Sequence, residues 1–170
     1  MKRSSLLVVV LLVAALAIGS WWFTNRTAPA PAAMPTAIPD AATEATIEYV
    51  HDGDTLFLTD GRKVRLLDID TPEIGDHLEC YGTEATDLLR QLLPEGTHVW
   101  VLAEVQPLDK YGRSLLHVFT DAGTLVNLVM VERGAAESVI LAPNVLYESQ
   151  FEAAEDSAQS LGVGMWSACG

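Results

Sequence analysis

The sequence has little of three features that mark common protein classes. Its 170 residues include two cysteines, too few for a disulfide-dense miniprotein or a zinc ribbon built on thiolates. None of the four histidines (His51, His77, His98 and His117) has a companion at a metal-ligand spacing, so we expect no zinc site. Only ten Lys and Arg residues stand against 23 Asp and Glu, which excludes a generally basic nucleic-acid coat.

The charges that are present are unevenly distributed. Lys2, Arg3 and Arg26 all precede Asp40, the first acidic residue, so the chain after residue 39 carries a formal charge of about −16. Acidic residues either keep a surface soluble or gather to hold a cation, and we expect solubility to account for most of them. Since 49% of the residues are hydrophobic, the chain has enough apolar side chains for a packed core.

Residues 1–23 resemble a membrane-targeting segment. Lys2 and Arg3 precede an almost unbroken apolar run over residues 6–23, which as a helix would reach about 27 Å, close to the thickness of the bilayer core. The segment is either a cleaved signal peptide or an uncleaved signal anchor with its N-terminus in the cytoplasm, and we favour the anchor. Either alternative predicts that the rest of the chain is exported: membrane-anchored if the leader stays, and secreted or periplasmic if it is cut.

Residues 24–45 are rich in Ala, Pro and Thr and predict an extended linker. The remaining residues, 46–170, have the length of one domain. Alternating patterns predict strands over 46–50, 55–58, 63–67, 97–103 and 114–119. Helical periodicity predicts helices over 85–93, 125–133 and 147–161. Short strands with three helices indicate an α+β fold, and we expect a small closed barrel.

Three short stretches concentrate the residues suited to chemistry: His51–Thr55, Arg65–Glu73 and Asp109–Arg113. Taken separately, each is an ordinary feature, because Asp-Gly turns are common and a charged residue at a strand end is usually solvated. Their joint occurrence in this order is more specific, and it resembles the staphylococcal-nuclease-like (thermonuclease) family. The matching segments are 50–55, 64–73, 79–85, 109–113 and 126–134.

This resemblance covers about residues 46–166 and implies a five-stranded OB-type barrel with helices. It also implies a Ca²⁺ site formed by the carboxylates of Asp54 and Asp70 and the backbone carbonyl of Thr71, with Asp52 acting through water. Carboxylate and carbonyl oxygens are hard ligands, which suit Ca²⁺ and suit zinc poorly.

The resemblance also assigns roles in phosphodiester cleavage. Glu73 matches the residue that positions or deprotonates the attacking water. Arg65 and Arg113 match the two arginines that contact the scissile phosphate, for which a planar guanidinium is suited. Lys110 and Tyr111 match positions that bind the terminal phosphate of the nucleotide.

The chain departs from the family where a base would stack. The family often has tyrosines just before a Pro-Asn pair, whereas this chain has Val139, Ile140 and Leu141 before Pro143-Asn144. We therefore expect weak base stacking at that point.

Cys80 and Cys169 are the only cysteines, and an exported domain folds in an oxidising compartment. We predict a disulfide between them that ties the C-terminal tail to the barrel. In the chain-entropy account, a loop of this size stabilises the fold by roughly 4–5 kcal/mol.

The sequence therefore predicts an exported, monomeric, Ca²⁺-dependent nuclease that hydrolyses phosphodiester bonds of DNA and/or RNA. Two alternatives remain open: a non-catalytic OB-type module that binds nucleic acid, and a calcium-binding module at the cell surface.

Overall fold

The structure is a computed structural model that describes residues 37–170. The predicted leader, residues 1–23, and most of the predicted linker lie outside the described residues. Among the helices of the described part, none combines the length and the apolar character needed to cross a membrane.

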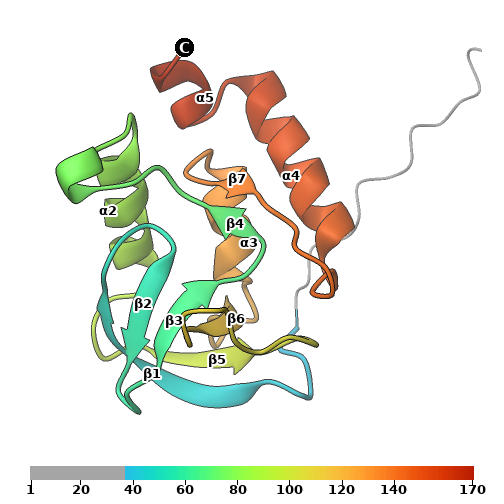
Figure 1. Cartoon of the computed structure of the whole chain (residues 1–170). Coiled ribbons are helices and arrows are strands. Elements are labelled where there is room, and N and C mark those ends of the chain that lie inside the picture. The colour runs from blue at the N-terminus through green and yellow to red at the C-terminus, as the bar shows by residue number, and fades with distance from the viewer. Residues whose placement is uncertain (1–36) are drawn as a thin grey trace, which may run out of the picture. The chain divides into compact units, whose positions relative to one another are not determined.

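Five strands close into a barrel in the order β1-β2-β3-β6-β5 (Figure 1). Their bounds are β1 Thr43–Val50, β2 Thr55–Leu58, β3 Lys63–Leu66, β5 His98–Leu102 and β6 Ser114–Phe119. Neighbouring strands are antiparallel except for β3 and β6, which run parallel. The predicted α+β class and the five-stranded barrel are confirmed.

Strand β1 pairs with two different strands along its length. Its first half pairs with β5 and its second half with β2, and the register shifts between Ile47 and Tyr49. Such an irregularity bends a strand, which allows a small sheet to close. Because residues 43–46 pair with β5, the strand begins three residues before the predicted start at Thr46.

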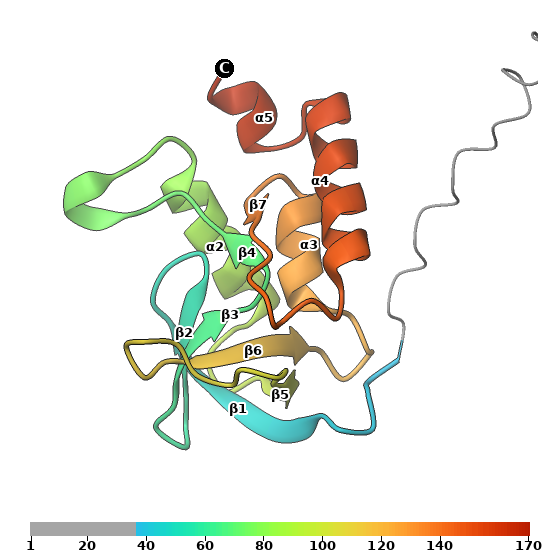
Figure 2. The same cartoon turned by 45° about the vertical axis from the view of Figure 1, so that its right-hand side comes forward.

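The helices lie at one end of the barrel, with α3 and α4 side by side (Figures 1 and 2). Their bounds are α2 Gly82–Leu92, α3 Val126–Glu132, α4 Glu148–Leu161 and α5 Met165–Ala168. A short 3₁₀ turn, η1, covers Gly75–His77. The three predicted helices are present, whereas η1 and α5 were not predicted.

Helix α2 forms where the apolar spacing predicts it. Ala85, Leu89 and Leu93 are fully or almost fully buried, and Leu88 and Leu92 pack against the same core. The pattern therefore places one face of the helix on the barrel and leaves the opposite face in solvent.

A two-stranded ribbon connects the barrel to the helices. It pairs β4, Ile69–Asp70, with β7, Glu137–Ser138. Asn127 in α3 holds the chain just before this ribbon, because its fully buried amide donates to the carbonyls of Leu67 and Leu116 and accepts from the N–H of Val118. The position of Asp70 therefore depends on α3 as well as on the barrel.

The predicted disulfide is confirmed. Cys80 and Cys169 are bonded, and they lie 89 positions apart in the chain. Cys80 precedes α2 and Cys169 follows α5, so the bond joins the C-terminal end to the segment between β4 and α2.

Candidate active site

The turn between β1 and β2 presents the first two acidic residues. One Asp52 oxygen accepts the backbone N–H of Asp54 at 3.1 Å and of Thr55 at 2.7 Å, which fixes the tight turn. Gly53 lies against Thr71, since a Cβ atom on Gly53 would be 2.5 Å from the Thr71 hydroxyl oxygen. The turn therefore packs closely against the segment that leaves β4.

Asp54 is buried in this contact. Its Oδ2 accepts both the N–H and the hydroxyl of Thr71, each at 3.2 Å, and its Oδ1 accepts the hydroxyl of Thr55 at 3.0 Å. Burial raises the pKa of Asp54 to about 6; Arg65 opposes this rise and the charge of Asp52 adds to it. The site thus holds a carboxylate whose negative charge a nearby cation would stabilise.

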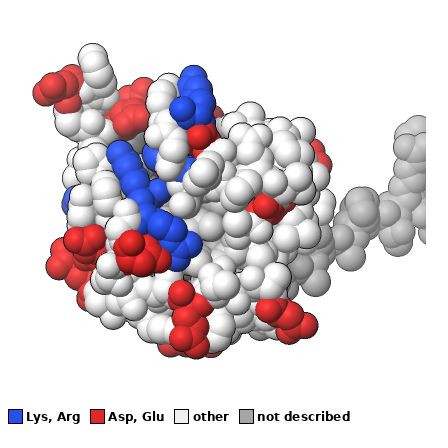
Figure 3. Space-filling view, turned by 60° about the horizontal axis from the view of Figure 1, so that its bottom comes forward, with Lys and Arg blue, Asp and Glu red and all other residues white. Residues whose placement is uncertain are grey.

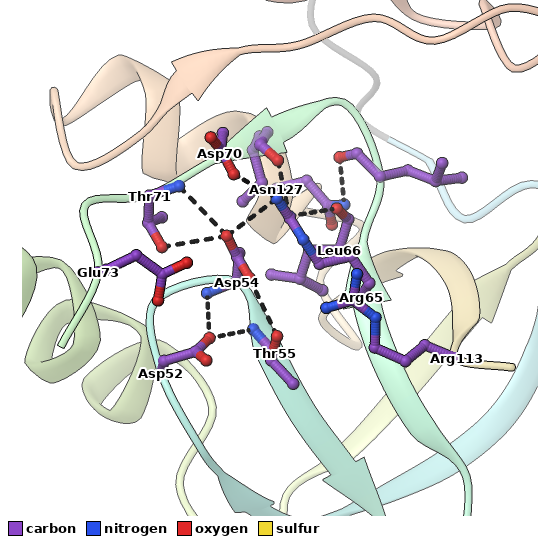
Figure 4. A network of polar contacts seen from close by, with 12 residues as sticks. Asp52, Asp54, Thr55, Arg65, Leu66, Asp70, Thr71, Glu73, Arg113 and Asn127 are labelled. Carbon is purple, nitrogen blue, oxygen red and sulfur yellow. Dashed lines mark hydrogen bonds and ion pairs between the residues drawn. The ribbon is translucent and has the colours of Figure 1, made fainter. Parts of the chain in front are cut away.

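Arg65 joins the two predicted carboxylate ligands. Its Nη2 lies 3.1 Å from Asp54 Oδ2 and also contacts Asp70 Oδ1 (Figure 4). Its Nη1 donates to the carbonyl of Ile69 at 2.7 Å and to that of Leu66 at 3.1 Å. The guanidinium is therefore held by β3 and β4 together.

Glu73 is exposed and comes from the segment after Thr71. Figure 4 shows its carboxylate pointing toward the side of Asp54. Its backbone is well fixed, because its N–H donates to the Glu79 carboxylate at 2.9 Å and its carbonyl accepts the Glu79 N–H at 2.9 Å. Gly82, the first residue of α2, lies so close to the Glu73 carbonyl that a Cβ atom would overlap it.

The second arginine is oriented by an acidic partner. Arg113 Nε donates to Asp109 Oδ2 at 2.6 Å, and the same carboxylate accepts the Arg113 N–H at its other oxygen. Although partial burial opposes it, these hydrogen bonds hold the pKa of Asp109 below its usual value. Figure 4 shows Arg113 extending toward Arg65.

A cleft of about 490 Å³ lies beside Arg65. Arg65, Arg113, Lys110 and Tyr111 all line it. Tyr111 is 72% exposed, and its ring has Lys110 Nζ at 4.9 Å and the Arg113 guanidinium carbon at 5.7 Å from its centre. Four of the predicted site residues therefore share one concave surface.

The predicted metal ligands do not line this cleft. Asp54, Asp70 and Thr71 contact one another or Arg65 on the other side of the guanidinium, and Glu73 stands near them without a side-chain hydrogen bond to a described residue. Arg65 is the one predicted residue, within residues 37–170, that touches the acidic group and also lines the cleft.

One wall of the cleft is apolar. It includes Val139, Leu141 and Ala142, and Leu141 is 70% exposed. Val139 and Leu141 are two of the three positions at which the sequence departs from the tyrosines of the family. The wall offers an aliphatic surface to a base, without an aromatic ring to stack on it.

The charge on the surface is divided. Figure 3 shows Lys and Arg side chains gathered in a strip on one face, with Asp and Glu side chains around its edge. A local positive strip is compatible with the acidic total, because net charge does not describe a single face.

One cluster of three ionisable side chains was not predicted from the sequence. Asp68, Glu104 and His117 come from three separate segments and bring one possible metal-ligand atom each to within 4.8 Å of the others. His117 and Glu104 lie 13 positions apart, so no local spacing indicated the group. It is a second acidic cluster, and its members differ from the predicted ligands Asp54, Asp70 and Thr71.

The arrangement around Arg65 is suited to an anion beside a hard cation. Two carboxylates and a backbone segment offer oxygen ligands, the guanidinium of Arg65 contacts both carboxylates, and that of Arg113 lines the cleft beside Arg65. The exposed carboxylate of Glu73 points toward the same group of residues (Figure 4).

The chain is similar to several known proteins. A family model described as "Staphylococcal nuclease homologue" matches residues 63–168. Endonuclease YncB of Bacillus subtilis is 31% identical in an alignment 131 residues long, which covers 74% of this chain and 62% of YncB. Endonuclease YhcR of the same organism is 31% identical in an alignment 137 residues long, which covers 72% of this chain and 11% of YhcR.

A protein of Escherichia coli O157:H7 named "Uncharacterized endonuclease" is 39% identical over 90 residues, 51% of this chain and 55% of that protein. The chain therefore spans less than two thirds of the length of each of these three relatives.

Proposed function

Since this chain belongs to the staphylococcal nuclease family, we propose that it is a nuclease, which hydrolyses phosphodiester bonds of DNA and/or RNA with the aid of Ca²⁺. The observation that carries this proposal is the position of Arg65, between two carboxylates and a cleft that a second arginine also lines. Such a site can hold a phosphate next to a divalent cation.

The residues present fit a hard cation. Asp54 and Asp70 would hold it with carboxylate oxygens and Thr71 with its backbone carbonyl, while Asp52 keeps the turn in place. When bound, Ca²⁺ would neutralise part of the negative charge that develops on the phosphate during attack by water. The donor set is all oxygen, which favours Ca²⁺ over zinc.

Arg65 and Arg113 would bind the scissile phosphate. Backbone carbonyls hold Nη1 of Arg65, and Asp109 holds Nε of Arg113, so both side chains enter the cleft with restricted conformations. Groups that are fixed before the reaction lose little freedom when charge develops on the substrate, which is why they stabilise the transition state effectively.

Glu73 would position or deprotonate the attacking water. Its backbone is fixed on both sides, by Glu79 and by the close approach of Gly82, while its carboxylate stays exposed to solvent. An accessible carboxylate on a rigid backbone is suited to this role.

Lys110 and Tyr111 would bind a terminal phosphate at the far end of the cleft, and the aliphatic wall at Val139 and Leu141 would contact a base. Substrate would approach along the strip of Lys and Arg side chains (Figure 3). We further propose that the protein is exported, either anchored to the membrane through residues 6–23 or released by cleavage of the leader, on the strength of the positive start and the apolar run. We also propose that it acts as a monomer, since one chain supplies every residue assigned to the site.

A cleavage assay on fluorogenic DNA and RNA at saturating Ca²⁺ tests the assigned roles. Glu73→Gln and Arg113→Ala should each lower the turnover rate by roughly 10²–10⁴-fold, the usual range for loss of a general base or of a charge-stabilising donor. Glu95→Gln and Arg90→Ala are matched controls on exposed residues away from the cleft, and they should cleave like the unmodified protein. Equal cleavage by all four variants would reject the roles.

A further inference from the structure

A second site stands beside the cleft and takes no part in the chemistry described above. It is formed by Asp68 in the turn between β3 and β4, Glu104 just after β5, and His117 in β6. Their side chains are 1%, 6% and 0% exposed, respectively. Three ionisable groups are thus enclosed at one point of the fold.

Asp68 lacks the partners that a buried carboxylate needs. Both of its oxygens are buried, and neither has a hydrogen-bond partner among residues 37–170. Among the described residues, the nearest side chain that can carry a positive charge is His117, whose Nε2 is 3.7 Å from Asp68 Oδ2. A buried carboxylate without compensation is costly and rare, so this side chain is either neutral or placed to bind a cation.

His117 offers a nitrogen to the same space. Its Nε2 lies 2.7 Å from Glu104 Oε1, while the second oxygen of Glu104 accepts the N–H groups of Val145 and Leu146 at 2.9 and 3.0 Å. Burial lowers the pKa of His117, although the hydrogen bond and charge of Glu104 oppose this shift. The lowered pKa favours the neutral ring. The centre of the His117 ring lies 4.9 Å from that of Tyr147, which restricts the imidazole plane, and Nε2 becomes a ligand when a cation displaces the proton that it shares with Glu104.

The charges around the group do not balance. Within residues 37–170, no Lys or Arg lies within ion-pair distance of Asp68 or Glu104, and Glu148 adds a further negative charge nearby. Burial, together with the charges of Glu104 and Glu148, raises the pKa of Asp68 to about 7. Two carboxylates and a neutral imidazole would be compensated by one divalent cation.

We propose that Asp68, Glu104 and His117 form a second metal site, which takes a borderline divalent cation of the Zn²⁺ or Co²⁺ class. One imidazole and two carboxylates are a common donor set for these ions, whereas Ca²⁺ prefers oxygen ligands alone. Asp68 also lines the cleft, so the cluster lies directly beside that cleft. The proposal stands apart from the nuclease function, and it departs from the sequence-based expectation that no histidine serves a zinc site.

The ligand atoms need small adjustments. Zinc-to-ligand distances of about 2.0–2.2 Å place tetrahedral ligand atoms about 3.3–3.6 Å apart. The distance between His117 and Glu104 is shorter than this, and that between His117 and Asp68 is slightly longer. An ion would therefore separate the first pair and draw Asp68 inward, which also ties the turn before Asp70 to β6.

The test uses the full chain, stripped of metal and kept in excess Ca²⁺ so that the all-oxygen site is saturated. Titration with Co²⁺ is followed by visible absorption, and equilibrium dialysis with Zn²⁺ gives the stoichiometry. We expect one equivalent of Co²⁺ with the visible bands of a nitrogen- and oxygen-ligated ion, displaced by one equivalent of Zn²⁺. Zinc at a hundredfold excess over its dissociation constant should raise the melting temperature by roughly 8–15 °C.

Asp68→Asn is the informative variant, because Asn tolerates the left-handed backbone of Asp68 (φ 64°) and nearly preserves its shape. It should fold, weaken Co²⁺ binding by at least about 100-fold and remove the thermal response to Zn²⁺. Two matched controls should bind as before: His98→Gln, since His98 is an exposed histidine 2.8 Å from Asp121, and Asp70→Asn, which alters the other acidic group.

A protein that binds neither ion, or one in which Asp68→Asn binds like the parent, would overturn the proposal. Loss of binding in His98→Gln or Asp70→Asn would do the same, since it would place the ion elsewhere. If the three groups only share protons, the parent will show no thermal response to Zn²⁺, while Asp68→Asn will still change the melting temperature of the metal-free protein.

Discussion

Replacing Asn127 by Ala removes a side chain that connects three backbone groups in the interior. The Asn127 amide accepts from Val118 N–H at 2.9 Å and donates to the carbonyls of Leu67 at 3.0 Å and Leu116 at 3.1 Å. Leu116 keeps another donor, because its carbonyl also accepts the Leu67 N–H. Two buried backbone groups therefore lose their side-chain partner outright, and a third loses one of two.

Each such hydrogen bond contributes about 1 kcal/mol, and an orphaned buried group adds about 1 kcal/mol or more to the loss. Two bonds lost outright and two orphaned groups together lower the free energy of unfolding by about 4 kcal/mol in Asn127→Ala. With a urea dependence of about 2 kcal/mol per molar, the midpoint should fall by roughly 2 M. The assay is urea unfolding of the full chain with the disulfide intact, followed by tryptophan fluorescence.

Asn144→Ala is the matched control. Asn144 is also buried, but its side-chain amide bonds, within the described residues, only to the N–H and carbonyl of Gln106, in a loop that lies partly in solvent. Its loss should cost about 1–2 kcal/mol, because water can replace its partners. The reasoning is wrong if Asn127→Ala lowers the free energy of unfolding by less than about 1.5 kcal/mol, or by no more than Asn144→Ala does. Either result would show that the Asn127 hydrogen bonds between α3 and the barrel are not important for stability.

Three further predictions concern the disulfide and the site. Replacing Cys80 and Cys169 together by Ser opens a loop of 89 residues and should lower the free energy of unfolding by up to about 4.6 kcal/mol; a midpoint unchanged in urea would contradict this. Gly82→Ala should displace the Glu73 backbone and lower the cleavage rate by at least about tenfold, whereas Gly61→Ala, in open space at a hairpin turn, should not; equal rates would show that this contact does not position Glu73. Arg65→Lys keeps the charge but loses the fork between Asp54 and Asp70, so cleavage should fall by roughly 10²-fold in the same assay; parent-like cleavage would show that charge alone suffices.

The barrel and its longer helices could be predicted from the sequence because their signals are local. Alternation over four or more residues predicted the strands, and the spacing of Ala85, Leu89 and Leu93 predicted the buried face of α2. The β4–β7 ribbon could not be predicted in this way. Each of its strands has two residues, which is too short for any period to be visible.

Only part of the candidate site could be predicted from the sequence. Asp54, Asp70, Thr71 and Arg65 were identified through a resemblance, and the structure brings them into contact. The separation of this acidic group from the cleft lined by Lys110 and Tyr111 could not be predicted, because it depends on where the turn before β6 lies.

The cluster of Asp68, Glu104 and His117 gave no signal in the sequence. In the sequence, Asp68 is one of several charged residues near a strand end, and His117 alternates within a strand like a structural residue. The three meet only because β3 and β6 pair in parallel and the segment after β5 lies against them. Tertiary contacts between distant segments produce such sites, and a single sequence does not record them.

The most direct test of the account is the calcium dependence of cleavage. Initial rates on DNA would be measured across free Ca²⁺ concentrations for the full chain and for Asp70→Asn, whose side chain is 60% exposed in the parent and whose fold should be unaffected. We predict cleavage that requires Ca²⁺ in the parent and a half-saturating concentration at least about tenfold higher in the variant. Cleavage that persists in excess chelator, or an identical calcium dependence for both proteins, would contradict the claim that these carboxylates hold the cation that the reaction uses.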